Sequence, residues 1–498
     1  MELATAIVDQ ITSMAIVYIA IGTFLGIIVG AIPGLTATML ISLSLPLTFF
    51  MSSDLALALL LGMYVGGVTG GLVTATLLNI PGTPASIVTT FDGFPMARRG
   101  EAGLALGWGI VASFVGSVIS WAFLVTLSKP LADFAIRFTS FDYFGLVLIS
   151  MFVIAAVSTG NMLKGILAGF LGMLVSLPGI DPIGGNYRFL FGVQELENGF
   201  RLMPVLVGLF AGSQVLSHLL SPDEADRNGS SKPYSIGRIM PPMPDIMQQM
   251  PNMARSSLIG TVVGILPGIG SNIGSMLAYT AARVVSKTPE KFGTGHRDGI
   301  VASEAGNNAT VGGALIPLVA MGIPGSVVDA VLMGAMAIHD VHPGPFLFRS
   351  NPGLIYGMMS AVLIASFFML LMMLVMTKHI VKVVNIPKHY LMAGIMTFCV
   401  AGSFALNNSW WDVWVMLIFS VVGYVLDRTG FSLAAFIIGL ILAPLAEEKL
   451  RVALQITNGG ILPLFTQNPI GAGLVALTAL VSLAMLFNAR RAASRRKS

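Results

Sequence analysis

Apolar residues run through this chain in long stretches, separated by short segments rich in glycine, proline and small polar residues. A helix that crosses a membrane needs about 20 consecutive, mostly apolar residues. With the shorter ones included, we count about a dozen hydrophobic segments. The pattern predicts an all-α polytopic membrane protein. Its clearest apolar stretches are Met14 to Val29, Leu104 to Leu127, Met203 to Leu220, Leu354 to Met376 and Leu474 to Phe487.

The longest polar stretch, residues 221–255, holds four acidic and four basic residues. We interpret it as a linker between a first transmembrane repeat, residues 1–220, and a second, residues 256–488. A basic tail, residues 489–498, follows the last apolar run. Because Lys and Arg favour cytoplasmic flanks, the C-terminus is predicted to be cytoplasmic.

Two short motifs of the first half recur in the same order in the second half. Gly26, Gly30, Pro33 and Gly34 recur as Gly260, Gly264, Pro267 and Gly268, shifted by 234 positions, and residues 79–86 (NIPGTPAS) recur as residues 322–329 (GIPGSVVD), shifted by 243. Chance among 56 Gly and 26 Pro is the alternative, but the conserved order favours a duplication. Internal repeats are typical of membrane transporters, whose sites lie where the repeats meet.

The orientation of the two copies follows from their loop charges. Residues 51–54, after the first motif, include no basic residue, whereas the equivalent region of the second copy contains Arg283, Lys287, Lys291 and Arg297. Opposite charge bias in equivalent loops favours opposite sides of the membrane. The two repeats are therefore predicted to be inverted.

The first recurring motif is predicted to break a helix and start another. Proline lacks an amide donor and glycine weakens a helix, and such breaks are tolerated in a bilayer only where the backbone is buried or lines a cavity. New helix N-termini offer free N–H groups, which suit carboxylates. Close helix packing by small residues is the alternative. The predicted substrate-binding residues here are Pro33, Gly34, Thr36, Thr38, Pro267, Gly268, Gly270, Ser271 and Asn272.

The second motif is predicted to form the tip of a hairpin that enters the membrane and turns back. Its candidate substrate-binding residues are Asn79, Pro81, Gly82 and Thr83, with Gly322, Pro324, Gly325 and Ser326 in the second copy. Upstream of the second tip lie several oxygen-bearing side chains that suit a hard cation such as Na⁺, whereas the first copy has Thr69 as its main polar side chain and otherwise offers carbonyls. The candidate cation ligands are Thr69, Glu304, Asn307, Asn308 and Thr310. Sodium is the expected coupling ion, with protons as the alternative.

Acidic residues in or beside apolar stretches are functional candidates, because charge is expensive in a membrane. Glu304, Asp92, Asp329 and Asp340 are of this kind, with interfacial placement as the alternative. Asp92 precedes Arg98 and Arg99, so a loop or ion-pair role competes there. The spacing of His339, Asp340 and His342, with no further Cys or His nearby, is weak support for a metal site, and no cofactor or metal other than the coupling ion is predicted.

Several longer segments go beyond these patterns. GAIPGLTATM, LLNIPGTPASIVTTFDGFPMARRGEAGLAL, GILPGIGSNIGSMLAY, EAGNNATVGGALIPLVAMGIPGS and HPGPFLF closely resemble the large membrane subunit of the bacterial tripartite tricarboxylate transporters. The resemblance implies a secondary transporter of the cytoplasmic membrane, working with a periplasmic substrate-binding protein and a small membrane subunit. It implies ion-coupled import of citrate-like di- or tricarboxylates.

Three other classes of protein are weighed against this one. A stand-alone organic anion transporter and a channel remain open. An intramembrane enzyme is disfavoured, because neither HExxH nor GxSxG occurs. Nucleic acid is not an expected partner of the basic tail, which suits a topology anchor beside anionic lipid.

Overall fold

The computed structural model describes residues 2–157, 162–181, 183–220, 236–268, 270–383, 388–405 and 407–495. Residues 221–235 of the predicted linker and 496–498 of the basic tail lie outside this range. The chain divides into two compact units: Met1–Ala132 with Arg201–Val425, and Asp133–Phe200 with Leu426–Ser498. Each unit takes residues from both predicted repeats. Packing units and repeats are different divisions of a chain, so the repeat boundaries stay a prediction.

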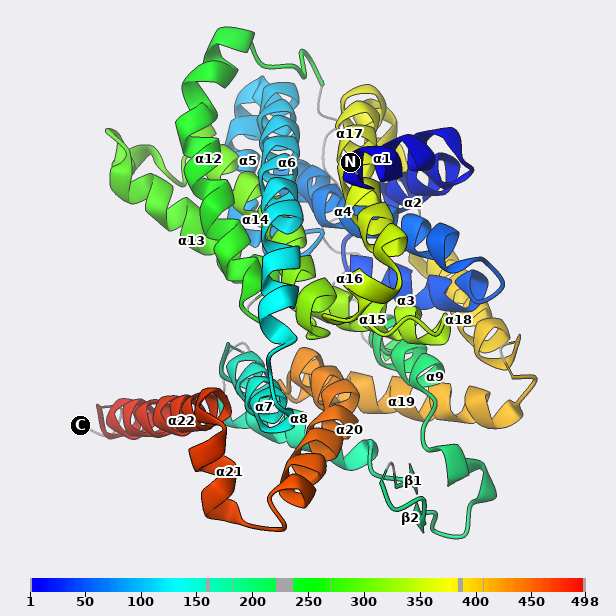
Figure 1. Cartoon of the computed structure of the whole chain (residues 1–498). Helices are drawn as coiled ribbons and strands as arrows, with labels where there is room; N and C mark the ends of the chain where they lie inside the picture. Colours follow the sequence, from blue (N-terminus) through cyan, green and yellow to red (C-terminus); the bar gives the residue numbers. More distant parts are fainter. Residues whose placement is uncertain are drawn as a thin grey trace. The chain divides into compact units, whose positions relative to one another are not determined.

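The first unit is helical throughout its described part (Figure 1). Its elements, with α6 and α19 reaching just past its limits, are α1 (Glu2–Thr12), α2 (Ala15–Gly30), α3 (Ala37–Thr48), α4 (Ser53–Leu78), η1 (Pro84–Ser86), α5 (Ile87–Met96), η2 (Ala97–Glu101), α6 (Ala102–Ala135), α9 (Leu202–Leu206), η4 (Val207–Gly212), α10 (Ser213–Leu220), α12 (Met243–Ile265), α13 (Gly270–Val285), η5 (Pro289–Lys291), α14 (Arg297–Met321), α15 (Val327–Ile338), α16 (Leu347–Ser350), α17 (Pro352–Val383), α18 (Lys388–Ala405) and α19 (Trp410–Arg428).

Five helical stretches of the described chain are long and apolar enough to cross a membrane, or seven if two bent helix pairs are counted as spans. They are Ser53–Leu78, Pro84–Ala135, Leu202–Leu220, Pro352–Ile380 and Trp410–Arg428, with the bent pairs Glu2–Thr12 plus Ala15–Gly30 and Ile461–Gln467 plus Pro469–Ser482. Five shorter apolar helices accompany them. The sequence therefore indicated the helical, multi-pass character correctly, although many of its apolar segments are too short to span alone.

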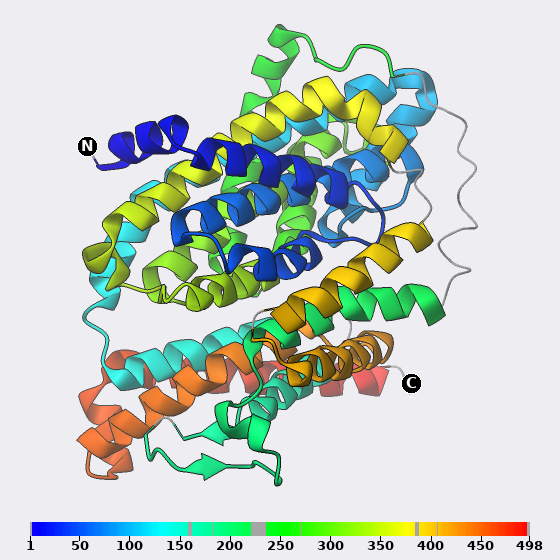
Figure 2. The ribbon, with the colours of Figure 1, turned by 90° about the vertical axis from the view of Figure 1, so that its right-hand side faces the viewer.

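Helix α4 is the most enclosed of these candidate spans, with its apolar window entirely buried in protein. It packs against α2, α3, α5, α14, α15 and α17, and Figure 2 shows α17 crossing the α2 and α4 helices. Glycines on α2 and α4 make close approach possible, as is common between membrane helices. A Cβ at Gly26 would collide with the carbonyl oxygen of Met63, and one at Gly30 with that of Gly67.

The same contacts occur between α12 and α14. A Cβ at Gly260 would collide with the carbonyl oxygen of Gly306, and one at Gly264 would meet that of Thr310. These glycines follow Gly26 and Gly30 by 234 positions, and their carbonyl partners follow Met63 and Gly67 by 243. The two helix pairs thus pack through equivalent backbone positions. This match supports a duplication, while its extent along the chain and the inversion of the copies stay predictions.

The second unit contains α7 (Ser140–Val157), α8 (Met162–Val175), η3 (Gln194–Asn198), α20 (Leu433–Ile456), α21 (Ile461–Gln467) and α22 (Pro469–Arg495). Helix α20 packs against α7 and α8, and α22 against α7. The second unit also contains a short antiparallel hairpin, β1 (Gly179–Ile180) and β2 (Tyr187–Arg188), which the all-α prediction did not include. Arg188 donates to both carboxylate oxygens of Glu447 at 2.6 and 2.7 Å and so fixes this hairpin to α20.

Candidate functional site

A polar cluster lies inside the first unit on one face of α14. Glu304, Asn307 and Asn308 are spaced three and four residues apart, which places them together on a helix. All three are completely buried, and Thr69 on α4 is buried with them. The structure therefore places Thr69 of the first copy beside Asn308 of the second, whereas the hydroxyl of Thr310 bonds to its own helix.

Hydrogen bonds connect this cluster across four helices. Thr69 Oγ1 donates to Asn308 Oδ1 at 2.6 Å, and Asn308 Nδ2 donates to Ser113 Oγ on α6 at 2.8 Å. Ser113 Oγ in turn donates to Glu304 Oε2 at 3.2 Å. Thr89 Oγ1 on α5 donates to the other oxygen, Glu304 Oε1, at 2.5 Å. The result is a continuous network that links α4, α5 and α6 to α14.

The cluster offers oxygen atoms and lacks a basic partner. Within the described residues, no Lys, Arg or His forms an ion pair with Glu304. Asn307 Oδ1 is buried without a hydrogen-bond partner. Thr310 Oγ1 donates to the carbonyl oxygen of Asn307 at 2.6 Å, so this hydroxyl keeps only its acceptor lone pairs free. Carboxylate, amide and hydroxyl oxygens are the ligands that suit a hard monovalent or divalent cation.

Sequence reasoning missed Thr89, Ser113 and Ser303, which complete this network. Ser303 Oγ lies 3.1 Å from Thr89 Oγ1. Each carries a single hydroxyl, and no spacing distinguishes it from the many serines and threonines that bond only to their own helix. Only the tertiary pairing of α5 and α6 with α14 selects them.

Helices break at all four recurring motifs, as predicted. Helix α2 ends at Gly30 and α3 begins at Ala37, and α12 ends at Ile265 before α13 begins at Gly270. The hydroxyl of Thr36 accepts a hydrogen bond from the amide of Met39 and so caps α3. Ser326 does the same for α15 by accepting from Asp329 N at 3.3 Å. These two hydroxyls thus serve their own helix starts, which leaves fewer free donors there.

The hairpin tips are closely packed. A Cβ at Gly82 would lie 2.6 Å from Thr74 Oγ1 and 2.8 Å from the Cα of Gly71, and one at Gly325 would lie 2.7 Å from the Cα of Ala314. Gly71 and Ala314 are themselves 243 positions apart, so each tip rests on the same point of its own long helix. Both tip glycines are therefore required for close packing.

Each tip also contacts the other copy. Helix α15, after the second tip, packs against α3, and η1, after the first tip, packs against α13. Within the second copy, the amide of Gly268 donates to the carbonyl of Gly325 at 2.7 Å. Helix α3 of the first copy thus lies beside the second copy's tip segment, and helix α13 of the second copy beside the first copy's tip segment. Among the predicted substrate-binding residues, Gly34, Asn79 and Asn272 are exposed.

The second tip carries a further buried acid. Asp329 is completely buried, and neither of its carboxylate oxygens accepts a well-aligned hydrogen bond from the described residues. Nearby, Tyr64 Oη on α4 lies 3.1 Å from Ser326 Oγ. Tyr64 occupies the position in α4 that Asn307 occupies in α14, 243 residues later. The two copies therefore place different side chains at equivalent points.

Asp92 has a structural role. It is completely buried, and its Oδ1 accepts from the amides of Gly293, Gly295 and His296 at 2.9, 2.8 and 2.7 Å. Tyr279 donates to Oδ2 at 2.9 Å. Among the described residues, Asp92 forms no ion pair with the nearby arginines. It anchors the loop that leads into α14, which agrees with the loop role weighed from sequence.

The remaining candidates lie elsewhere. Asp340 is exposed, and no group of three metal-ligating side chains occurs among the described residues, including those around His339 and His342.

Apolar helices of spanning length around a fully buried polar network define a multi-pass helical membrane protein with an interior site.

Comparison with known proteins narrows this class. Residues 16–438 match the model of the tripartite tricarboxylate transporter TctA family. A protein of Agrobacterium vitis, described as an uncharacterized 52.8 kDa protein in the TAR-I ttuC' 3' region, is 33% identical over 477 residues, 96% of this chain and 94% of that protein. Another from the same organism, in the TAR-II ttuC' 3' region, is 34% identical over 218 residues, 44% of this chain and 90% of its own length. No solved structure matches.

The chain belongs to the tripartite tricarboxylate transporter TctA family. It is therefore a transport protein and not an enzyme.

Proposed function

We propose that this chain is the solute-translocating subunit of a three-component importer of di- or tricarboxylates in the bacterial cytoplasmic membrane. A periplasmic substrate-binding protein delivers the carboxylate, and a small membrane subunit completes the complex. The family and the helical, multi-pass structure support this proposal.

The buried network of Glu304, Asn307 and Asn308 with Thr69 is the proposed site of the coupling cation, with Na⁺ as first choice. A buried carboxylate without a basic partner is costly, and a cation bound by neighbouring oxygens would offset that cost. The unpartnered Asn307 Oδ1 is the single observation that carries this assignment, because a buried amide oxygen normally has a partner.

The substrate carboxylates are proposed to bind at the starts of α3 and α13, near Thr36, Thr38 and residues 270–272. Alternating access would move the tip segments against the long helices α4 and α14. Each tip segment packs against the opposite copy. A movement of one copy would therefore shift the proposed substrate-binding segment of the other.

Uptake of labelled citrate tests the proposal in liposomes that contain the chain, its small subunit and its binding protein. Asn308→Ala removes the hydrogen bonds to Thr69 and Ser113, and we expect the apparent affinity for Na⁺ to fall. Unchanged Na⁺ dependence in this variant would refute the cation assignment. Full activity without Na⁺ but with a proton gradient would assign the coupling to protons instead.

A further inference from the structure

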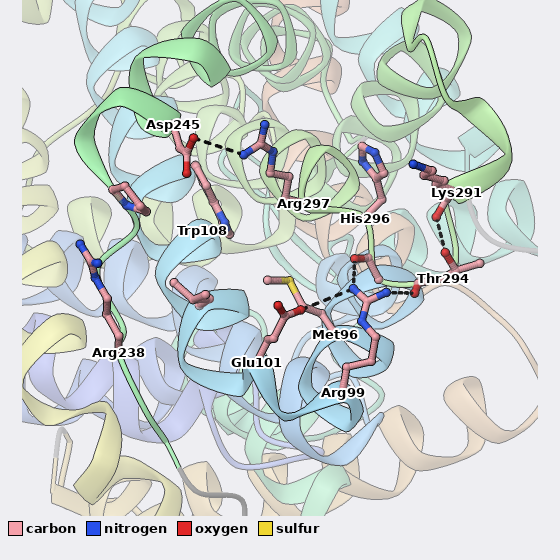
Figure 3. A pocket seen from close by; sticks show the side chains of 13 residues that line it. Met96, Arg99, Glu101, Trp108, Arg238, Asp245, Lys291, Thr294, His296 and Arg297 are labelled. Carbon is pink, nitrogen blue, oxygen red and sulfur yellow. Dashed lines mark hydrogen bonds and ion pairs between the residues drawn. The ribbon is translucent and has the colours of Figure 1, made fainter.

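A second candidate site lies away from the buried network, at one end of the helices. A pocket of about 510 Å³ is lined by residues from the junction of α5 with α6, from the start of α12 and the segment before it, and from the loop that leads into α14 (Figure 3). None of the predicted substrate or cation residues lines it. The transport mechanism therefore does not account for it.

The pocket carries excess positive charge. Four basic side chains, Arg99, Arg238, Lys291 and Arg297, face two carboxylates, those of Glu101 and Asp245. The N-terminal ends of α6, α12 and α14 add partial positive charge at the same place, offset in part by the C-terminal end of the α5–η2 helix. The lining is thus suited to an anion with more than one negative oxygen.

Two of the basic groups are held in place. Arg99 donates to the carbonyl oxygens of Thr294 and Gly295 at 3.0 and 2.5 Å. The Arg297 guanidinium lies 5.7 Å from the centre of the Trp108 ring, beside Asp245 (Figure 3). Such contacts fix the positions of these cations before a ligand arrives, which lowers the entropy cost of binding.

The other two basic groups are free to bind a ligand. Among the described residues, no carboxylate forms an ion pair with Lys291 or with Arg238, whose Nε donates to the carbonyl of Met240. Both residues are exposed. Trp108, Met96 and Leu104 contribute apolar surface to the same pocket, so it offers both a charged and an apolar wall.

We propose that this pocket binds a phosphate-bearing anion, namely the headgroup of an anionic phospholipid. Basic pockets between membrane helices recognise such headgroups, and the bias of Lys and Arg predicts that this end faces the cytoplasm. The ligand contacts the loop of residues 291–296, which Asp92 anchors and which leads directly into α14. Its binding therefore stabilises the start of the helix that carries Glu304.

Binding of short-chain phosphatidylglycerol to the full-length protein, against phosphatidylcholine of the same chain length, tests this proposal. We expect saturable, phosphatidylglycerol-selective binding and a raised thermal unfolding midpoint. The double variant Arg238→Gln/Lys291→Gln should bind about thirty-fold more weakly, because each basic residue near an anionic lipid contributes about 1 kcal/mol. The matched control Arg283→Gln/Lys287→Gln removes the same charge from exposed positions that do not line the pocket.

Equal binding of the two lipids would overturn the proposal. So would an equal loss in both double variants, since that result means a general surface attraction. Inorganic phosphate serves as a competitor in the same assay. No displacement by millimolar phosphate supports the lipid headgroup, whereas displacement supports a phosphate site and assigns free phosphate as its ligand.

Discussion

The hydroxyl of Thr69 links α4 to α14 by a short hydrogen bond. It donates to Asn308 Oδ1 at 2.6 Å in a fully buried setting. A buried acceptor that loses its donor pays its full desolvation cost, about 1–3 kcal/mol. This one side chain therefore holds a member of the proposed cation site in its orientation.

Thr69→Val keeps the shape of the side chain and removes the donor. We expect a loss of about 1–3 kcal/mol in stability and at least about a tenfold weaker apparent affinity for Na⁺. Thermal unfolding and Na⁺ titration of uptake measure the two effects. Thr126→Val is the control, because Thr126 is exposed and bonds only to its own helix. Equal effects in both variants would contradict the role of Thr69.

Asp92 makes a separate prediction at the same scale. Asp92→Asn keeps an oxygen acceptor but removes the charge that three amides and Tyr279 stabilise. Hydrogen bonds to charged groups contribute about 1.5–3 kcal/mol each, so we expect a clear drop in the unfolding midpoint. The exposed Asp340→Asn should change it little. If the two substitutions behave alike, Asp92 is not an anchor.

The sequence predicts these residues unevenly. Glu304, Asn307 and Asn308 stand out because polar groups are rare in an apolar run, and their helical spacing places them together. Their partners Thr89 and Ser113 do not stand out, because a single hydroxyl within a helix can bond to the backbone of its own helix and so needs no tertiary partner. The role of Asp92 also depends on a loop about two hundred residues away, which no local pattern reveals.

At the scale of elements, proline and glycine at a helix end are informative because their effect is local. All four breaks were therefore predictable from the sequence. The contacts of each broken helix end were not predictable, because the packing of α15 on α3 and of η1 on α13 depends on the whole first unit. The division into two units also escaped the sequence, because each unit joins segments that are distant along the chain.

Gly325→Ala tests the packing of the second tip. The added Cβ would lie 2.7 to 2.8 Å from atoms of Ala314, closer than real Cβ contacts, so the tip must shift. We expect a loss of about 1–3 kcal/mol and strongly reduced uptake, with membrane insertion retained. Gly394→Ala on α18 is the control, because a Cβ there meets nothing within 4 Å. Normal uptake by the Gly325 variant would show that the tip is loosely packed.

At the scale of the whole molecule, membership in a tripartite family predicts that the chain depends on partners. The chain alone in liposomes with an inward Na⁺ gradient should give no uptake of labelled carboxylate. Uptake should appear only when the small subunit is co-reconstituted and the substrate-loaded binding protein is added outside. The reason is energetic: a translocation cycle that starts from a docked binding protein needs the docking free energy to open the outward-facing site. Vesicles without the chain control for leak, and intact protein in the proteoliposomes controls for insertion. Substantial uptake by the chain alone would identify a stand-alone transporter, and rates far above those of a conformational cycle would indicate a channel.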